Sequence, residues 1–237
     1  MVGSGALFFS LAPQRAFLAD INCELINFYR VLRSRVYKLH GALRPLLADD
    51  QTYYALRASN PDSSLDRATR FFYLVRLSWN GLYRVNRDGC YNVPFGGRRP
   101  KELLPLERAV AASRVLRKAR LACGDFELTT SGIKRGDFVY FDPPYPKGAF
   151  EDDGFSRYSA TGFRLDDHKR LARHAANLAD RGVHVLITEA ARKEILRFYS
   201  KAFRITFVRN LSLIAASPES RRDAYEAILT SYRVEAP

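Results

Sequence analysis

Segments with strand-like and helix-like patterns alternate at both ends of this chain, up to about residue 45 and again from about residue 120. In the first stretch, residues 15–19 are predicted to form a strand that ends in Asp20, and Asn22 is placed to cap the helix that follows. The second stretch predicts strands at 137–141, 183–188, 203–208 and 227–234 and helices at 166–181 and 191–199. Such alternation favours a doubly wound α/β fold.

The middle of the chain, residues 46–116, has a different pattern of helices with one hairpin. Asp88-Gly89 indicates a tight turn between the segments 81–86 and 90–95. We interpret 46–116 as an inserted, mainly helical domain that contains a β-hairpin. Residues 1–45 and 117–237 then form the α/β domain.

Composition narrows the class of protein. The chain has 237 residues, 47% of them hydrophobic, which is typical of a globular protein with an ample core. No apolar run is long enough to span a membrane, and no signal-peptide pattern is present, so a cytoplasmic protein is expected. The cysteines Cys23, Cys90 and Cys123 lack metal-ligand spacing and are expected to be free thiols in a reducing compartment. The four histidines are scattered, and no metal is predicted.

The net charge of +13 favours an anionic partner, with nucleic acid as the first candidate. The basic residues of the hairpin region, Arg84, Arg87, Arg98, Arg99 and Lys101, stand beside the aromatic residues Tyr83, Tyr91 and Phe95. Basic and aromatic residues together suit phosphate contact and base contact. A solvated hairpin remains the alternative. Tyr158 and Phe163 could line a pocket or belong to the core.

Asp142-Pro143-Pro144-Tyr145 follows the apolar strand 138–141 and suits the methylation of an amino group conjugated to a ring. Such a nitrogen must pyramidalise before it can attack a methyl sulfonium, and acceptors must hold its hydrogens meanwhile. The Asp142 carboxylate can accept one hydrogen and the Pro143 carbonyl the other, because the two prolines fix the local backbone. The Tyr145 ring offers a face on which a planar base can stack. A proline-rich turn with one exposed acid is the alternative.

Two further sites are candidates for binding a nucleoside cofactor. Gly3-Ser4-Gly5 forms a turn before a helix, where the absence of Cβ atoms lets a ligand approach the backbone. Asp20 ends the next strand, and an acid in that position holds ribose hydroxyls in dinucleotide folds. S-adenosylmethionine carries the same ribose without phosphates. Asp125 beside Phe126 could read an adenine amino group and cover its ring. An ordinary turn or helix cap remains the alternative at each position.

Taken in order, these segments resemble the Dam-type (alpha-group) adenine-N6-specific DNA methyltransferases over nearly the whole chain. The resemblance rests on residues 2–6 with 18–22, 79–86, 92–96, 124–126, 142–145, and on Tyr158 with Phe163. It implies an S-adenosylmethionine-dependent enzyme that flips adenine out of double-stranded DNA and methylates its N6, acting as a monomer. The implied catalytic residues are Asp142, Pro143, Pro144 and Tyr145. The implied cofactor residues are Gly3, Ser4, Gly5, Asp20, Asp125, Phe126 and Asp142. The implied DNA-contacting residues are Tyr83, Arg84, Asn86, Arg87, Asn92, Arg98, Arg99, Lys101 and Tyr158.

The sequence departs from the family pattern at two places. Only Met1 and Val2 precede the glycine turn, where relatives have a strand and a lysine-bearing segment, so the chain from Met1 is expected to bind the cofactor weakly and to aggregate. Thr188-Glu189-Ala190-Ala191 stands where relatives usually have Ser-Asn-Ser-Asp. Two other functions therefore stay open: a catalytically impaired DNA-binding remnant, and methylation of another planar nitrogen such as RNA adenine or protein glutamine.

Overall fold

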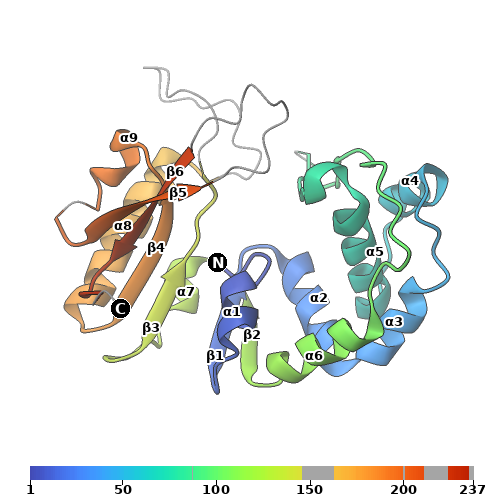
Figure 1. Cartoon of the computed structure of the whole chain (residues 1–237), viewed down its shortest axis with the longest axis horizontal. Coiled ribbons are helices and arrows are strands. Elements are labelled where there is room, and N and C mark those ends of the chain that lie inside the picture. The colour runs from blue at the N-terminus through green and yellow to red at the C-terminus, as the bar shows by residue number, and fades with distance from the viewer. Residues whose placement is uncertain (87, 146–162, 200, 211–223, 235–237) are drawn as a thin grey trace. The chain divides into compact units, whose positions relative to one another are not determined.

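The fold is known from a computed structural model, which describes residues 1–86, 88–145, 163–199, 201–210 and 224–234. The chain divides into two compact units (Figure 1). The first unit is Val2–Asp125, and the second is Phe126–Pro237 together with Met1. Residues 46–116 thus belong to the same compact unit as residues 2–45.

The first unit is mainly helical and holds a two-stranded parallel sheet. Its elements are α1 (Ala6–Leu11), β1 (Ala16–Asp20), α2 (Cys23–Ser34), α3 (Val36–Leu43), α4 (Asp50–Ala58), α5 (Ser64–Leu77), the 3-10 turn η1 (Trp79–Gly81), α6 (Leu106–Leu116) and β2 (Ala119–Cys123). The predicted cap at Asn22 is confirmed, since its Oδ1 accepts the backbone N–H groups of Glu24 and Leu25. Asn22 thereby fixes where α2 starts, directly after β1.

The carboxyl ends of β1 and β2 lie side by side, because the strands pair in parallel from Ala16 opposite Ala119 to Asp20 opposite Cys123. The core of this unit gathers apolar faces of α2, α3 and α5, including the fully buried Leu39. Two distant segments of the sequence therefore end at one edge, and the loop after each strand lies beside the other.

The predicted hairpin is present as a reversal of chain direction, in which two isolated residue pairs join the opposing segments. Val85 pairs with Tyr91, and Ser78 pairs with Phe95. Gly96 donates its N–H to the Leu77 carbonyl, and a Cβ added at Gly96 would lie 2.6 Å from the Ser78 carbonyl oxygen. A residue without a side chain is therefore required where the returning strand meets the end of α5.

The second unit is a mixed sheet covered by helices. Its elements are α7 (Phe126–Thr129), β3 (Phe138–Phe141), α8 (Leu165–Asp180), β4 (His184–Ala190), α9 (Lys193–Leu196), β5 (Arg204–Asn210) and β6 (Ala224–Thr230). The strand order is β3-β4-β6-β5, with β3 and β4 parallel and β6 antiparallel to both of its neighbours. The apolar face of α8, including Leu171 and Leu178, packs in one core with Val185 and Ile187 of β4. This mixed α/β architecture confirms the predicted α/β class, while the inserted domain stays a prediction.

Element boundaries differ from the sequence prediction in the last part of the chain. The helix expected over 191–199 is the short α9, which continues as turns to Tyr199. The strand expected over 227–234 is β6, which ends at Thr230 opposite Leu186 of β4. Pairing partners set both ends of such a strand, and a hydrophobic pattern does not show them.

The expectation of free thiols is wrong for two of the three cysteines. Cys23 and Cys123 form a disulfide with Cα atoms 5.2 Å apart, while Cys90 is free and exposed. Their separation of 100 residues hid the pairing in the sequence. The parallel register brings them together, because Cys123 ends β2 beside the residues that connect β1 to α2.

No helix within the described ranges is long and apolar enough to cross a membrane.

Candidate active site

The glycine turn and Asp20 lie together, as the sequence predicted. The Asp20 carboxylate accepts the N–H of Gly3 through Oδ2 at 3.1 Å and the N–H of Asn22 through Oδ1 at 3.0 Å. Gly5 has a φ of +69°, and a Cβ there would lie 2.9 Å from the ring of Phe9. The turn thus needs glycine at Gly5.

Tyr29 of α2 secures the same turn from the other side. Its hydroxyl donates to the Gly3 carbonyl oxygen at 2.8 Å. Burial, and then the nearby charge of Asp20, raise the pKa of Tyr29, so the phenol stays protonated and keeps donating. Tyr29 was not among the residues that the sequence singled out. Its hydroxyl, however, fixes the position of a predicted cofactor residue.

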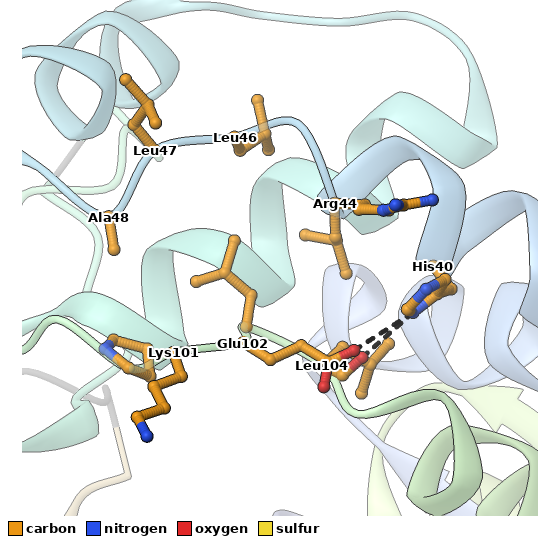
Figure 2. A pocket seen from close by; sticks show the side chains of 11 residues that line it. His40, Arg44, Leu46, Leu47, Ala48, Lys101, Glu102 and Leu104 are labelled. Atoms are coloured by element: carbon orange, nitrogen blue, oxygen red, sulfur yellow. Dashed lines mark hydrogen bonds and ion pairs between the residues drawn. The ribbon is translucent and has the colours of Figure 1, made fainter.

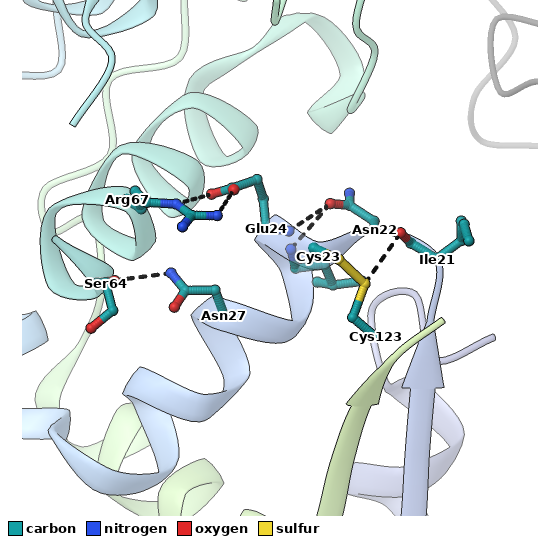
Figure 3. A network of polar contacts seen from close by, with 9 residues as sticks. Ile21, Asn22, Cys23, Glu24, Asn27, Ser64, Arg67 and Cys123 are labelled. Atoms are coloured by element: carbon teal, nitrogen blue, oxygen red, sulfur yellow. Dashed lines mark hydrogen bonds and ion pairs between the residues drawn. A yellow bond between two sulfur atoms is a disulfide. The ribbon is translucent and has the colours of Figure 1, made fainter. Parts of the chain in front are cut away.

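The loop after β2 meets the loop after β1 where Cys123 contacts Ile21 and Cys23 (Figure 3). Gly124 donates its N–H to the Asp20 carbonyl oxygen at 3.0 Å, and Cys123 is bonded to Cys23 at the start of α2. Asp125 follows at once in the chain. Two covalently joined loops therefore carry the acids predicted to bind the ribose and the adenine of a cofactor.

Phe126 lies in a different setting from the one predicted. Its ring is only 6% exposed and belongs to the core of the second unit, where it contacts Phe141 and Phe163. The guanidinium of Arg170 lies 4.5 Å from the centre of the ring. Phe163, for which a pocket and a core role were both open, packs against this core.

The Asp142-Pro143-Pro144-Tyr145 segment directly follows β3, as expected. Asp142 is exposed and Pro143 is buried. The Thr188 hydroxyl donates to Asp142 Oδ1 at 2.7 Å. Burial, and then the charges of Glu226 and Asp142, raise the pKa of the Tyr145 phenol, although a hydrogen bond between Tyr145 and Thr188 acts in the opposite direction. Tyr145 is therefore neutral around pH 7.

Thr188 is the residue of this site that sequence reasoning missed as a functional group. Phe141 pairs with Ile187, so the residues that follow them, Asp142 and Thr188, come side by side. The predicted strand ends could have shown this: strands were expected to end at Phe141 and Thr188, and parallel neighbours in a sheet end at the same edge. The sequence did not show the register in which these two strands pair.

The predicted DNA-contacting residues of the hairpin fall into two groups. Three of them hold the hairpin itself: Asn86 Oδ1 accepts the N–H groups of Asp88 and Cys90, Asn92 Oδ1 accepts Arg84 Nε–H at 2.7 Å, and the Tyr83 ring packs on Tyr91. The second group is exposed and basic: Arg84, Arg98, Arg99 and Lys101. Arg87 and Tyr158 lie outside the described residues.

Lys101 also borders a hollow of the first unit that is about 580 Å³ in volume (Figure 2). The hollow lies between the end of α3 and the segment before α6, and its polar side chains include Arg44 and Glu102. Glu102 is turned toward His40, whose Nδ1 lies 4.0 Å from Oε1. The hollow contains none of the predicted catalytic or cofactor residues.

Comparison with known proteins places the chain in a family. Residues 2–212 match the D12 class N6 adenine-specific DNA methyltransferase family. The chain belongs to this family and is therefore an enzyme of the adenine-specific DNA methyltransferase class, as the resemblance predicted.

Individual relatives agree with this assignment. The chain is 34% identical over 241 residues to the Type II methyltransferase M1.LlaDCHI of Lactococcus lactis subsp. cremoris, covering 98% of this chain and 84% of that protein. It is 30% identical to the Type II methyltransferase M.MjaIII of Methanocaldococcus jannaschii, covering 98% and 86%. It is 31% identical to the DNA adenine methylase of Escherichia coli K12, covering 85% and 74%.

Proposed function

We propose that this enzyme transfers a methyl group from S-adenosylmethionine to N6 of an adenine flipped out of double-stranded DNA. The observation that carries the proposal is the exposed Asp142 carboxylate at the end of β3, held through Oδ1 by Thr188. Family membership supports N6 of adenine in DNA over RNA adenine or protein glutamine.

The residues at the end of β1 fit the nucleoside of the cofactor. A carboxylate offers about four lone-pair sites, and Asp20 uses one oxygen for each of two backbone N–H groups. It can still accept hydrogen bonds from ribose hydroxyls. We assign the ribose to Asp20, with Gly3, Ser4 and Gly5 beside it, and the adenine amino group to Asp125. Bound S-adenosylmethionine would supply the electrophilic methyl group.

The target amine is activated by acceptors from this chain. Asp142 Oδ2 accepts one N6–H, and the Pro143 carbonyl oxygen accepts the other, while Tyr145 stacks on the base. Both acceptors favour pyramidal N6, whose lone pair would form the new C–N bond as the bond between the methyl group and the cofactor sulfur breaks, leaving a neutral thioether. The extra N6 proton would then pass to water. Acceptors fixed in advance do not have to reorganise as charge develops on the nitrogen.

We also propose that residues 46–116 form the DNA target-recognition region, with the exposed Arg84, Arg98, Arg99 and Lys101 at phosphates or base edges. Asn86, Asn92 and Tyr83 support that surface by holding the hairpin. Base flipping requires such an anchored duplex, because the reacting nitrogen otherwise lies inside the base pair.

The test is transfer of a tritiated methyl group to duplex DNA by the wild type and by Asp142→Ala. The variant is expected to lose roughly two to three powers of ten in kcat, the usual effect of removing one preorganised acceptor. Asp180→Ala, which removes an exposed carboxylate at the end of α8, is the matched control and should keep wild-type activity. Near-normal turnover by Asp142→Ala would refute the assignment, and equal transfer to RNA would refute the choice of DNA.

A further inference from the structure

A short chain of hydroxyl groups leads to the catalytic carboxylate. The Tyr140 hydroxyl lies 3.1 Å from Thr188 Oγ1, and the Thr188 hydroxyl donates to Asp142 Oδ1 at 2.7 Å. Tyr140 belongs to β3 and Thr188 to β4, whereas Asp142 begins the loop after β3. Two paired strands thus fix one oxygen of a loop carboxylate.

The direction of this chain follows from counting hydrogens. An ionised carboxylate only accepts, so the single hydroxyl hydrogen of Thr188 is committed to Asp142. Tyr140 must then be the donor in its contact with Thr188. Burial, with a smaller contribution from the charge of Asp142, raises the pKa of Tyr140, so its phenol remains a donor around neutral pH.

We propose that Thr188 is a positioning residue for methyl transfer: its hydroxyl fixes the rotation of the Asp142 carboxylate so that Oδ2 faces the target amine. The inference rests on the proposed role of Asp142. A free carboxylate on an exposed loop samples many rotations, and only some of them place an oxygen on the amine hydrogen. Holding the acceptor in the productive geometry lowers the barrier without adding to substrate affinity.

The location of Thr188 makes a purely structural role a poor explanation. Side chains of β4 alternate between the core and the other face, and Ile187 and Glu189 are buried while Thr188 is only partly buried. Thr188 does not belong to the hydrophobic core of the second unit. Replacing its hydroxyl by a methyl group of similar shape should therefore leave the fold in place.

The experiment compares Thr188→Val, which removes the hydroxyl, with Thr188→Ser, which retains it. Thr188→Val should lower kcat by about tenfold to a hundredfold, the range expected for a lost hydrogen bond to a charged group. Its KM for duplex DNA and for S-adenosylmethionine should stay within about twofold of wild type, because a group that acts on the barrier alone does not change ground-state binding. Thr188→Ser should restore most of kcat. Equal losses in both variants, or an unchanged kcat in Thr188→Val, would overturn the proposal.

A double-mutant cycle shows whether Thr188 acts through Asp142. In an Asp142→Ala background measured under single-turnover conditions, adding Thr188→Val should change the rate far less than it does in the wild type. Full additivity would overturn the proposal. If Asp142→Ala itself retains activity, the proposed role of Asp142 fails first, and the two failures are thereby distinguished.

Tyr140→Phe keeps the test decisive if Thr188→Val does not fold. It removes the donor to Thr188 and should reduce kcat roughly two- to tenfold, as for loss of a neutral hydrogen bond. In that case, wild-type kcat in Tyr140→Phe would overturn the proposal, and a selective loss of kcat with unchanged KM would support it.

Discussion

His168 Nδ1 lies 2.6 Å from Glu189 Oε1, and both side chains are buried, at 1% and 0% exposure. Glu189 is one of the residues at which the chain departs from the family pattern. Its second oxygen, Oε2, accepts the N–H of Ala190 at 3.0 Å. Glu189, which departs from the family pattern, therefore has a partner on α8. The pair of His168 and Glu189 connects α8 to β4 immediately beside Thr188.

Glu189→Ala should destabilise the second unit by about 1–3 kcal/mol, because it leaves the buried His168 Nδ1 without its hydrogen-bond partner. Urea unfolding followed by circular dichroism measures the change. Glu194→Ala, which removes an exposed carboxylate on α9, is the control and should change stability by less than about 0.5 kcal/mol. Equal stability of both variants would show that the pair contributes nothing.

The disulfide between Cys23 and Cys123 should stabilise the first unit and support cofactor binding. It closes a loop of 100 residues, for which chain-entropy arguments give at most about 4.7 kcal/mol, and about 2–4 kcal/mol is expected. Reduction should lower the unfolding free energy by that amount. It should also weaken S-adenosylmethionine binding in calorimetric titration, because it frees the loops that carry Asp20 and Asp125 from each other.

Cys90→Ser is the control for the disulfide, since Cys90 is free and exposed. It should respond to reductant as the wild type does, whereas Cys23→Ser should not respond. A wild type whose stability and cofactor affinity are both unchanged by reductant would contradict the prediction.

Tyr73 should make the protein sensitive to alkaline pH. Its hydroxyl donates to the Leu47 carbonyl oxygen at 2.5 Å, and burial, followed by the charge of Asp49, raises its pKa from 10.0 to about 12. The folded state thus holds this proton more tightly than the unfolded state. The resulting contribution of Tyr73 to the free energy of unfolding is complete below pH 10 and is lost as pH rises from 10 to about 12.

Urea unfolding at pH values on both sides of 10 tests this dependence. Tyr73→Phe should flatten the loss of stability above pH 10, but only partly, because burial also raises the pKa of Tyr53. Tyr37→Phe, at a position that is 69% exposed, is the matched control and should leave the profile unchanged. A Tyr73→Phe profile identical to that of wild type would contradict the assignment.

Local signals in the sequence predicted most of the elements. Asn22 marked the start of α2 through its capping side chain, and Asp88-Gly89 marked the reversal of the hairpin. The contacts that were missed are all long-range. The disulfide of Cys23 with Cys123 and the hydrogen bond of Thr188 with Asp142 depend on strand register, and register is set by the packing of the whole sheet.

The roles of the candidate site residues stay predictions, but the structure shows how some of these residues are arranged. Asp20 accepts the N–H of Gly3 in the glycine turn, and both the tight turn and the end of the strand were visible in the sequence. The Asn86 side chain holds the turn of the hairpin, and its predicted contact with DNA stays a prediction. Asparagine suits both tasks, and sequence does not separate them. Phe126 was assigned to the cofactor by its neighbour Asp125, but its ring packs in a core.

The last prediction concerns the exposed basic residues that follow the hairpin. Arg98 and Arg99 are exposed, whereas Arg84 donates its Nε–H to Asn92. If Arg98 and Arg99 each neutralise one phosphate, Arg98→Ala with Arg99→Ala should make the slope of log affinity against log salt shallower by about two times 0.9. Fluorescence anisotropy with duplex DNA across a salt series measures it, and cofactor affinity should not change.

Two comparisons sharpen this test. Arg117→Ala with Lys118→Ala removes the same charge from exposed positions between α6 and β2, and should leave the slope nearly unchanged. Arg84→Ala should act differently, because the tie to Asn92 gives its guanidinium a fixed orientation suited to a base edge. Loss of this side chain should relax the sequence preference. It should weaken binding to the preferred DNA site, and to that site alone, by about 1–3 kcal/mol. If all three variants shift the slope equally, only net charge matters and this surface is not the DNA interface.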